Sequence, residues 1–418
     1  MKITQKSELL MAFFSTNKYI VPISQTKTMD KIIVELYHDI LDAYKYLLTL
    51  KKTNVNIYNI NTKRIFSFSQ IKRPKNFNSN SFPHAVRRHI DEYMMSEISY
   101  HFFLFEREIK IYFLVEEEHI ELQINKYNKY VDYIIMWLYI INQYASKQCS
   151  HSLTVYFYFT SLEKHLPASH ISILDKINVN TAFTTTCPKD SEIVVFRKEE
   201  WFKGFIHETF HNFGLDFSDM NNSEIKKCIL SIFNVKSDVN LYEAYTEFWA
   251  EIMNALFCSF IFSKNKLNIE KFLSNAYYFI NFERIYSFFQ LVKILNFMGL
   301  QYKDLYSTSE QSKILRNHLY KEKTNVLSYY VIKCILINNY PSFLLWCKTN
   351  NLSILQFKKT LLNQNEFCKY IQKNYKTRKM LDGIYNTQLF FYKISMKKHN
   401  KNFQYLLSNL RMSICELG

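Results

Sequence analysis

The chain has 418 residues, of which 48% are hydrophobic and 22% are charged, and its formal net charge at pH 7 is +16. This composition is typical of a globular chain that can bury a large core, and it excludes an intrinsically disordered protein. Lysines and arginines are scattered among acidic residues, and their strongest cluster lies at residues 393–401. The charge therefore favours a solvated basic surface, with weak, non-specific contact to nucleic acid or another anionic surface as the alternative.

The cysteines and the apolar runs bear on where the protein works. The eight cysteines form no CxxC pair and are widely spaced, which argues against a disulfide framework and favours a reducing compartment. The longest apolar runs, such as residues 133–141, are far shorter than the roughly 18 to 20 residues that cross a bilayer. The N-terminal stretch lacks the long apolar core and the cleavage site of a signal peptide. We therefore expect an intracellular protein without a transmembrane helix.

Hydrophobic periodicity predicts the first elements of the chain. Residues 29–51 carry apolar side chains at a helical period and predict an amphipathic helix. Residues 54–81 are polar and predict a loop-rich connection with one short strand at residues 64–68. Residues 98–104 and 109–115 then alternate with a period of two, which predicts a β-hairpin.

The middle of the chain predicts strands that lead into a helix. Residues 127–145 predict a strongly apolar helix, and residues 153–160 predict a buried strand. Residues 179–185 and 192–197 predict a second hairpin, and a helix over residues 199–213 follows it directly.

The rest of the chain is helical in pattern. Residues 240–262 predict a second long helix. Further helical periods lie at residues 272–282, 285–298, 326–338 and 354–362, and a basic segment follows.

The helix at residues 199–213 contains the motif His207-Glu208-x-x-His211. Two histidines four residues apart project from one face of a helix, and a glutamate beside the first can reach the space before them. That arrangement is typical of a zinc site with a general base. The surrounding positions are uncharged and mostly apolar, as in a buried helix: Phe205, Ile206, Thr209, Phe210 and Phe213.

Two of the five glycines flank this motif. Gly204 lies one turn before His207, where the missing side chain permits a neighbouring element to approach closely. Gly214 lies three residues after His211, where a left-handed residue would end the helix. Ordinary helix punctuation is the alternative for each glycine.

The helix at residues 240–262 carries Glu243, Glu247 and Glu251 at intervals of four, so the three carboxylates share one stripe. Carboxylates on a buried stripe are costly unless positive charge faces them. A bound metal with its histidines would supply that charge. The helix therefore offers candidates for the third metal ligand.

The two helices together resemble the gluzincin class of metallopeptidases, in which Glu-Ala-x-x-Glu on a second helix completes an HExxH site. The resemblance implies Zn²⁺ held by His207, His211 and Glu243, with Glu247 orienting His207. A register shifted by one turn would instead make Glu247 the ligand and Glu251 the orienting group.

Metzincins share the glycine spacing after the motif, but Phe217 occupies the position of their histidine ligand and cannot bind metal. Asp216 is the remaining alternative for the third ligand, although it lies one residue out of that register.

The resemblance extends upstream to residues 180–183. In thermolysin-like gluzincins an edge strand with a similar Asn-Ala segment holds the extended substrate, which implies substrate contacts at Ala182 and Phe183. A plain core hairpin is the alternative. Residues 178–217 also resemble uncharacterised metallopeptidases of large nucleocytoplasmic DNA viruses. A viral source would place the protein in the host cytoplasm or in the virion.

We therefore expect an α+β fold with a zincin-like two-lobed core, formed by a mixed sheet, an active-site helix and a helical lower lobe. The expected regions are a helical and loop-rich N-terminal region (1–95), the catalytic core (96–265) and a helical C-terminal region (266–418). The implied function is zinc-dependent hydrolysis of a protein or peptide substrate, with Glu208 assisting the attack of a zinc-bound water. The alternatives are an inactive zincin-fold protein for binding or virion assembly, and a basic nucleic-acid-associated protein.

Overall fold

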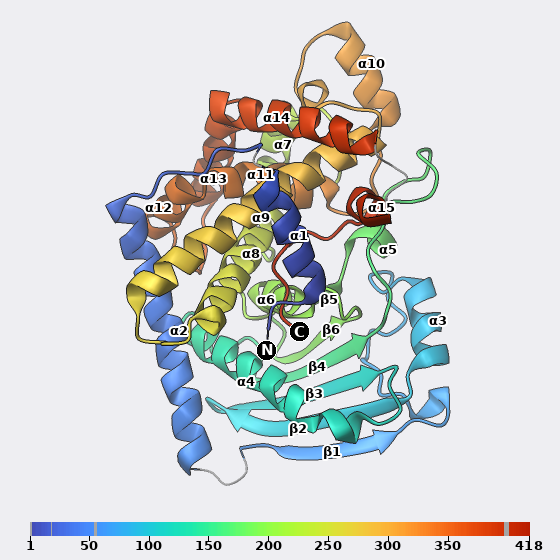
Figure 1. Cartoon of the computed structure of the whole chain (residues 1–418), viewed down its shortest axis with the longest axis vertical. Coiled ribbons are helices and arrows are strands. Elements are labelled where there is room, and N and C mark those ends of the chain that lie inside the picture. The colour runs from blue at the N-terminus through green and yellow to red at the C-terminus, as the bar shows by residue number, and fades with distance from the viewer. Residues whose placement is uncertain (1, 18, 54–56, 397–400) are drawn as a thin grey trace.

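A computed structural model describes residues 2–17, 19–53, 57–396 and 401–418 and has an α+β fold built on one mixed sheet (Figure 1). The strands are β1 Asn59–Arg64, β2 Ser96–Leu104, β3 Arg107–Val115, β4 Ser152–Phe159, β5 Ala182–Thr184 and β6 Asp190–Val195. Their order in the sheet is β1-β2-β3-β4-β6-β5. β4 is parallel to both β3 and β6, and all other neighbours are antiparallel. The predicted α+β class and mixed sheet are confirmed.

The longer helices surround and extend the sheet. They are α1 Gln5–Thr16, α2 Lys27–Thr53, α3 His84–Tyr93, α4 Ile124–Asn142, α6 Trp201–Asn212, α7 Ser223–Ile232, α8 Leu241–Phe262, α9 Ile269–Phe297, α10 Glu310–Leu319, α12 Tyr340–Asn350, α13 Leu361–Asn374, α14 Arg378–Ser395 and α15 Lys401–Ser408. Short helical segments are η1 Phe68–Gln70, η2 Ile120–Gln123, α5 Lys176–Val179, η3 Tyr302–Leu305, the π-helical η4 Leu327–Ile332 and α11 Lys333–Asn338.

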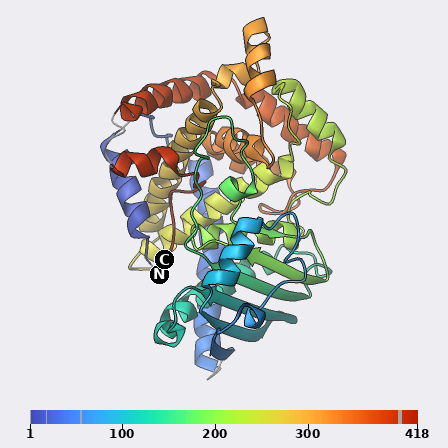
Figure 2. The ribbon, with the colours of Figure 1, turned by 90° about the vertical axis from the view of Figure 1, so that its right-hand side faces the viewer.

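The strands β4 and β6 are covered on both faces because they are largely apolar on both sides, whereas β1 is mostly exposed. On one face, α4 and α6 join the main hydrophobic core, which continues into the C-terminal helices. On the other face, α3 and the segment before it form a second, smaller core against β3, β4 and β6. Figure 2 shows α3 on the outer side of the sheet, away from most of the helices. β5 lies at the edge of the sheet, so one side of that strand has no neighbouring strand among the described residues.

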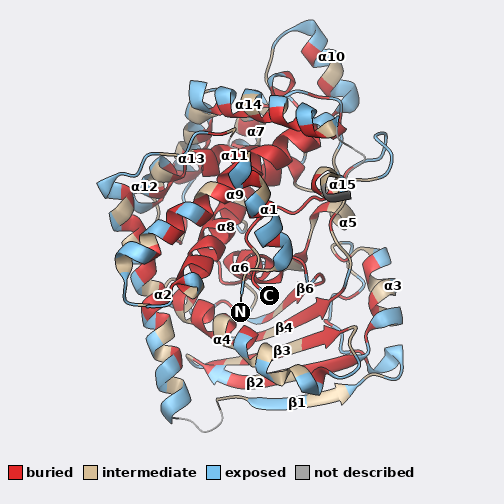
Figure 3. Ribbon diagram, in the orientation of Figure 1, coloured by how far each residue is buried: buried red, intermediate tan, exposed pale blue. Residues whose placement is uncertain are grey.

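The helices beyond the sheet are organised around α8 and α9, which are buried along most of their length (Figure 3). η4 and α11 pack on both of these helices, and α14 packs on α9. Residues 409–417 run through the interior, and Leu417 forms a β-bridge with Ile3. The N-terminal and C-terminal segments therefore meet beside the start of α6. The predicted boundaries at residues 95 and 265 stay predictions.

Most of the elements predicted from periodicity are present. Both predicted hairpins form, as β2–β3 and β5–β6, and α2, α4, α6 and α8 lie at the predicted positions. The two predicted helices at residues 272–282 and 285–298 are a single helix, α9. The basic segment predicted after the last helices lies partly outside the described residues, because residues 397–400 are not described.

Two predicted elements are wrong. The short strand lies at Asn59–Arg64 rather than at residues 64–68, because its partner β2 begins at Ser96, which pairs with Arg64. Beyond that point Phe66 and Phe68 are 80% and 63% exposed. Most of the helix predicted at residues 354–362 is irregular backbone, because α13 begins only at Leu361 and Phe357 N–H donates to Leu215 O at 2.8 Å.

The expectation for the cysteines is also wrong. Disulfides join Cys149 to Cys187 and Cys228 to Cys368, while Cys258, Cys334, Cys347 and Cys415 are free. The first pair forms because Cys149 and Cys187 precede β4 and β6, and neighbouring parallel strands start at the same edge of a sheet. Spacing along the chain does not reveal such a pair. The cysteines consequently no longer argue for a reducing compartment.

Candidate metal centre

α6 carries the three motif residues, with Gly204 in its first turn and Gly214 two residues after its end. At Gly204 a Cβ atom would lie 3.3 Å from Thr181 Cγ2, so the absent side chain lets α6 pack tightly against the residue before β5. Gly214 has a φ of +66°, and its N–H donates to His211 O at 3.1 Å. The helix ends there because this left-handed conformation disfavours other residues. Both glycine interpretations from the sequence agree with these contacts.

The side chains of His207, His211 and Glu243 converge on one point. The two Nε2 atoms are 3.2 Å apart, and Glu243 Oε2 lies 3.1 Å from His207 Nε2 and 3.5 Å from His211 Nε2. A tetrahedral zinc with bonds near 2.0 to 2.1 Å requires ligand atoms roughly 3.3 Å apart. The donor set and its spacing therefore fit one zinc ion.

The opposite nitrogen of each imidazole is held by a buried carboxylate. His207 Nδ1 lies 2.8 Å from Glu247 Oε2, and His211 Nδ1 is hydrogen-bonded to Asp216 Oδ2. Such contacts fix the tautomer and turn Nε2 toward the metal position. Glu247 and Asp216, the two alternative third ligands, thus lie behind the histidines, whereas Glu243 lies in front of them. Asp216 as the partner of His211 was not anticipated from the sequence.

Two buried lysines pair with the carboxylate stripe of α8. Lys203 Nζ is 2.6 Å from Glu247 Oε1, and Lys333 Nζ is 2.5 Å from Glu251 Oε1. The expectation that a metal and its histidines would balance all three carboxylates is therefore wrong for Glu251, which faces Lys333, and incomplete for Glu247, which contacts both Lys203 and His207. Burial opposes ionisation of Glu247, but Lys203 and His207 outweigh it and hold the pKa of that carboxyl below its usual range.

The spacing of Lys203 could have indicated this pairing from the sequence. Lys203, His207 and His211 are four residues apart on α6, as are Glu243, Glu247 and Glu251 on α8. Because the two stripes face each other in opposite directions, Lys203 meets Glu247 while His211 meets Glu243. The row of charge pairs between α6 and α8 thus ends at the candidate metal ligands.

Glu208 lines a cavity of about 420 Å³ beside the metal position, and its side chain has no hydrogen-bond partner among the described residues. Burial raises the pKa of Glu208 to about 7, against the opposing effect of the two histidines. Tyr329, on η4, lines the same cavity and donates its hydroxyl to Glu243 Oε2 at 2.8 Å. With 31 tyrosines in the chain, nothing in the sequence distinguished this one.

The edge strand β5 forms one wall of this cavity, to which Ala182 and Phe183 contribute. Thr181 O accepts a hydrogen bond from Phe196 N at 2.9 Å, so the backbone of Thr181 faces β6. Because backbone direction alternates along a strand, the N–H and C=O of Ala182 face the open edge. Of the two predicted substrate contacts, Ala182 is thus the one whose backbone faces outward.

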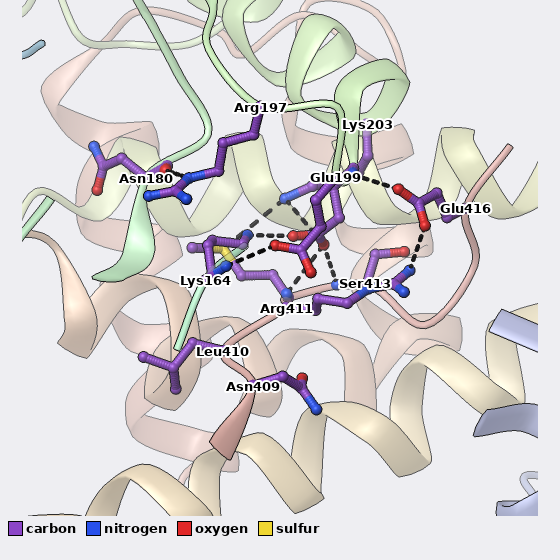
Figure 4. Close-up of polar contacts among 12 residues, drawn as sticks. Lys164, Asn180, Arg197, Glu199, Lys203, Asn409, Leu410, Arg411, Ser413 and Glu416 are labelled. Atoms are coloured by element: carbon purple, nitrogen blue, oxygen red, sulfur yellow. Dashed lines mark hydrogen bonds and ion pairs between the residues drawn. The ribbon is translucent and has the colours of Figure 1, made fainter. Parts of the chain in front are cut away.

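The residue before α6 belongs to a buried polar cluster that also forms hydrogen bonds with the C-terminal segment (Figure 4). Glu200 Oε1 accepts hydrogen bonds from Met412 N at 3.0 Å and Ser413 N at 2.6 Å. Glu200 Oε2 forms an ion pair with Lys164, and Glu416 Oε1 accepts the Glu200 N–H at 2.8 Å. These contacts fix the helix that carries the histidines.

The chain matches no protein-family model, no curated protein and no solved structure. Its function must therefore be inferred from the site. None of the helices in the described ranges combines the length with the apolar character that a bilayer crossing requires.

Proposed function

We propose that the chain is a zinc-dependent metallopeptidase with a zincin-like, two-lobed core. The observation that carries this proposal is the convergence of His207, His211 and Glu243 at tetrahedral spacing beside Glu208, whose carboxylate has no hydrogen-bond partner in the described part of the chain. In the proposed core, the sheet and α6 form one lobe, and α8 with the helices that follow forms the other. The gluzincin-like order of motifs supports the same assignment.

Zinc is the metal that these residues fit best. Two imidazole nitrogens and one carboxylate oxygen are a zinc ligand set that leaves a fourth position open, as catalysis requires. When bound, zinc would polarise a peptide carbonyl and lower the pKa of water at the open position. Glu247 and Asp216 would keep the imidazoles neutral at Nε2 and correctly oriented.

The residues around the metal position have separate proposed roles in peptide hydrolysis. Glu208 takes a proton from the attacking water and passes it to the leaving amine. Tyr329, whose hydroxyl points into the site, is our candidate for the hydrogen bond that stabilises the oxyanion. The open edge at Ala182 offers backbone groups to an extended peptide.

Metal analysis and two substitutions test this proposal. The purified protein should contain about one zinc ion per chain and lose it in His207→Ala. Glu208→Gln should keep the zinc and lose peptide hydrolysis, because the amide cannot accept the proton of water. Glu224→Gln on exposed α7 is the matched control, with unchanged zinc and activity.

Two results would count against the proposal in different ways. A chain that binds no zinc, with wild-type stability in His207→Ala, would refute the metal site itself. A zinc-loaded wild-type protein that cleaves no peptide in a diverse library would instead point to an inactive zincin-fold protein that serves in binding or assembly.

A further inference from the structure

Residues 322–325, the bridging segment, form one wall of the cavity of about 420 Å³ beside the metal position. On the side of the sheet, Lys323 N–H donates to Leu174 O at 2.9 Å, and Thr324 Oγ1 donates to Asn180 Oδ1 at 2.8 Å. Because Asn180 lies just before β5, an extended peptide on the open edge of that strand meets the bridging segment at one end.

The bridging segment is also tied to the residues that precede α8. Asn240 Nδ2 donates to Asn325 Oδ1 at 3.1 Å, and the Ser237 hydroxyl donates to Glu322. Ser328, just after the segment, donates its hydroxyl to Asn240 O at 2.7 Å. Contacts on both sides of the cavity therefore hold this wall in place.

Two side-chain amides of the cavity wall have donor groups to spare. The oxygens of Asn180 and Asn325 accept hydrogen bonds from Thr324 and Asn240, but their NH₂ groups donate to none of the described residues. Neither amide nitrogen is buried, and both residues line the cavity. A ligand in the cavity can therefore accept hydrogen bonds from them.

Two lysines that line the same cavity have no carboxylate partner within the described ranges. Lys323 is exposed, and its side chain makes no hydrogen bond there. Lys176 Nζ donates to Asn80 O at 3.0 Å, which uses one of its three protons. Both ammonium groups thus remain available to an anionic ligand.

The carboxylates that line the cavity outside the proposed metal centre are already engaged. Asp238 forms an ion pair with Lys226, which lies outside the cavity. Glu322 accepts the Ser237 hydroxyl and the Leu327 N–H, the latter at 3.0 Å, and burial raises the pKa of this carboxyl to about 7. The charge left at this end of the cavity is therefore mainly positive.

We infer that this cavity selects peptides that present a carboxylate to the bridging segment. Lys323 and the amides of Asn180 and Asn325 would donate to the carboxylate, and Lys176 would add positive charge. The carboxylate is either the C-terminus of the peptide or an aspartate or glutamate side chain. This inference rests on the proposed metallopeptidase function and names its substrate class.

Competition binding to the zinc-loaded protein tests the inference without requiring turnover. Acetohydroxamate, which carries only the metal-binding group, reports on the metal site. Two series of peptide hydroxamates carry that group at the N-terminal or the C-terminal end and have glutamate or glutamine in the next two positions. The first series is also made with a free or an amidated C-terminus, so that the two sources of carboxylate are distinguished.

We expect at least one carboxylate-bearing probe to bind about tenfold more tightly than its neutral amide counterpart, as charge-assisted hydrogen bonds allow. Lys323→Gln should reduce that preference to about threefold or less, whereas Lys323→Arg should largely retain it. Lys321→Gln is the matched control: it removes the same charge from an exposed residue two positions earlier that does not line the cavity.

The outcomes separate the two proposals. If acetohydroxamate does not bind, both the metal site and this inference are overturned. If it binds but every carboxylate probe matches its amide counterpart, the metal site stands and the carboxylate assignment is wrong. A preference that survives in both Lys323→Gln and Lys176→Gln, or that falls equally in Lys321→Gln, would reflect the general positive charge of the chain and would also overturn the assignment.

Discussion

Glu243 and Glu247 lie one turn apart on α8, and the proposed function gives them different roles that two substitutions can separate. Glu243→Gln removes an oxygen that lies 3.1 Å from His207 Nε2 and 3.5 Å from His211 Nε2. Glu247→Gln instead removes a charge that lies between His207 Nδ1 and Lys203 Nζ. The first change should act on zinc affinity and the second mainly on the free energy of unfolding.

The expected magnitudes follow from these contacts. Structural zinc sites contribute about 10 to 16 kcal/mol from four ligands, so losing one ligand should cost about 3 kcal/mol, or roughly two orders of magnitude in zinc affinity. Loss of an orienting carboxylate typically lowers metal affinity by about 10- to 100-fold. Glu247→Gln also leaves the buried Lys203 without its carboxylate, which should destabilise the zinc-free protein by on the order of 3 kcal/mol.

Competition with a chromogenic chelator measures zinc affinity, and urea unfolding of the zinc-free proteins measures stability. Glu243→Gln should show the larger loss of zinc affinity, and Glu247→Gln the larger loss of zinc-free stability, because the second change removes the nearest carboxylate of buried Lys203. Glu224→Gln, an exposed carboxylate on α7, serves as the control for both assays. If Glu247→Gln abolished zinc binding while leaving zinc-free stability unchanged, Glu247 would be the ligand and the present assignment of Glu243 would be refuted.

Three further predictions concern residues that the tertiary structure brings to the cleft. Asp216→Asn should lower zinc affinity by about 10- to 100-fold through His211, measured by the same competition. Tyr329→Phe should leave zinc content unchanged but lower kcat/KM by on the order of 100-fold, and equal activity would exclude Tyr329 as the oxyanion donor. Burial raises the pKa of Glu322 to about 7, so the folded chain holds that proton at pH values where the unfolded chain has lost it. The stability that this group contributes is complete below about pH 4.3 and is lost as pH rises through 7. Urea unfolding with a chelator present measures this loss. Across that range, the free energy of unfolding of the wild type should fall by up to about 3 kcal/mol relative to Glu322→Gln.

Local periodicity was sufficient to predict the elements that carry the site. The two hairpins and the helices α4, α6 and α8 are present as predicted, because each has a clear period of apolar side chains on a buried face. The strand placed at residues 64–68 and the helix placed at residues 354–362 were wrong for a common reason. Both depend on a partner elsewhere in the chain. The position of the strand depends on its pairing with β2, and the backbone around Phe357 is hydrogen-bonded to Leu215.

The sequence by itself determined the motif residues His207, Glu208 and His211 and the carboxylate stripe of α8, because residues four apart share one face of a helix. It left open which glutamate faces the histidines, and it could not pair Lys203 with Glu247, Asp216 with His211 or Cys149 with Cys187. Lys203 and Glu247 are distant along the chain, as are Cys149 and Cys187, and Tyr329 is distant from the motif. Asp216 lies only five residues after His211, but it lies outside the helix that periodicity describes. The packing of α6 against α8, with η4 beside them, decided the contacts of the site, and the pairing of β4 with β6 decided the disulfide. Periodicity could not, since it describes one element at a time while a site requires several elements to meet.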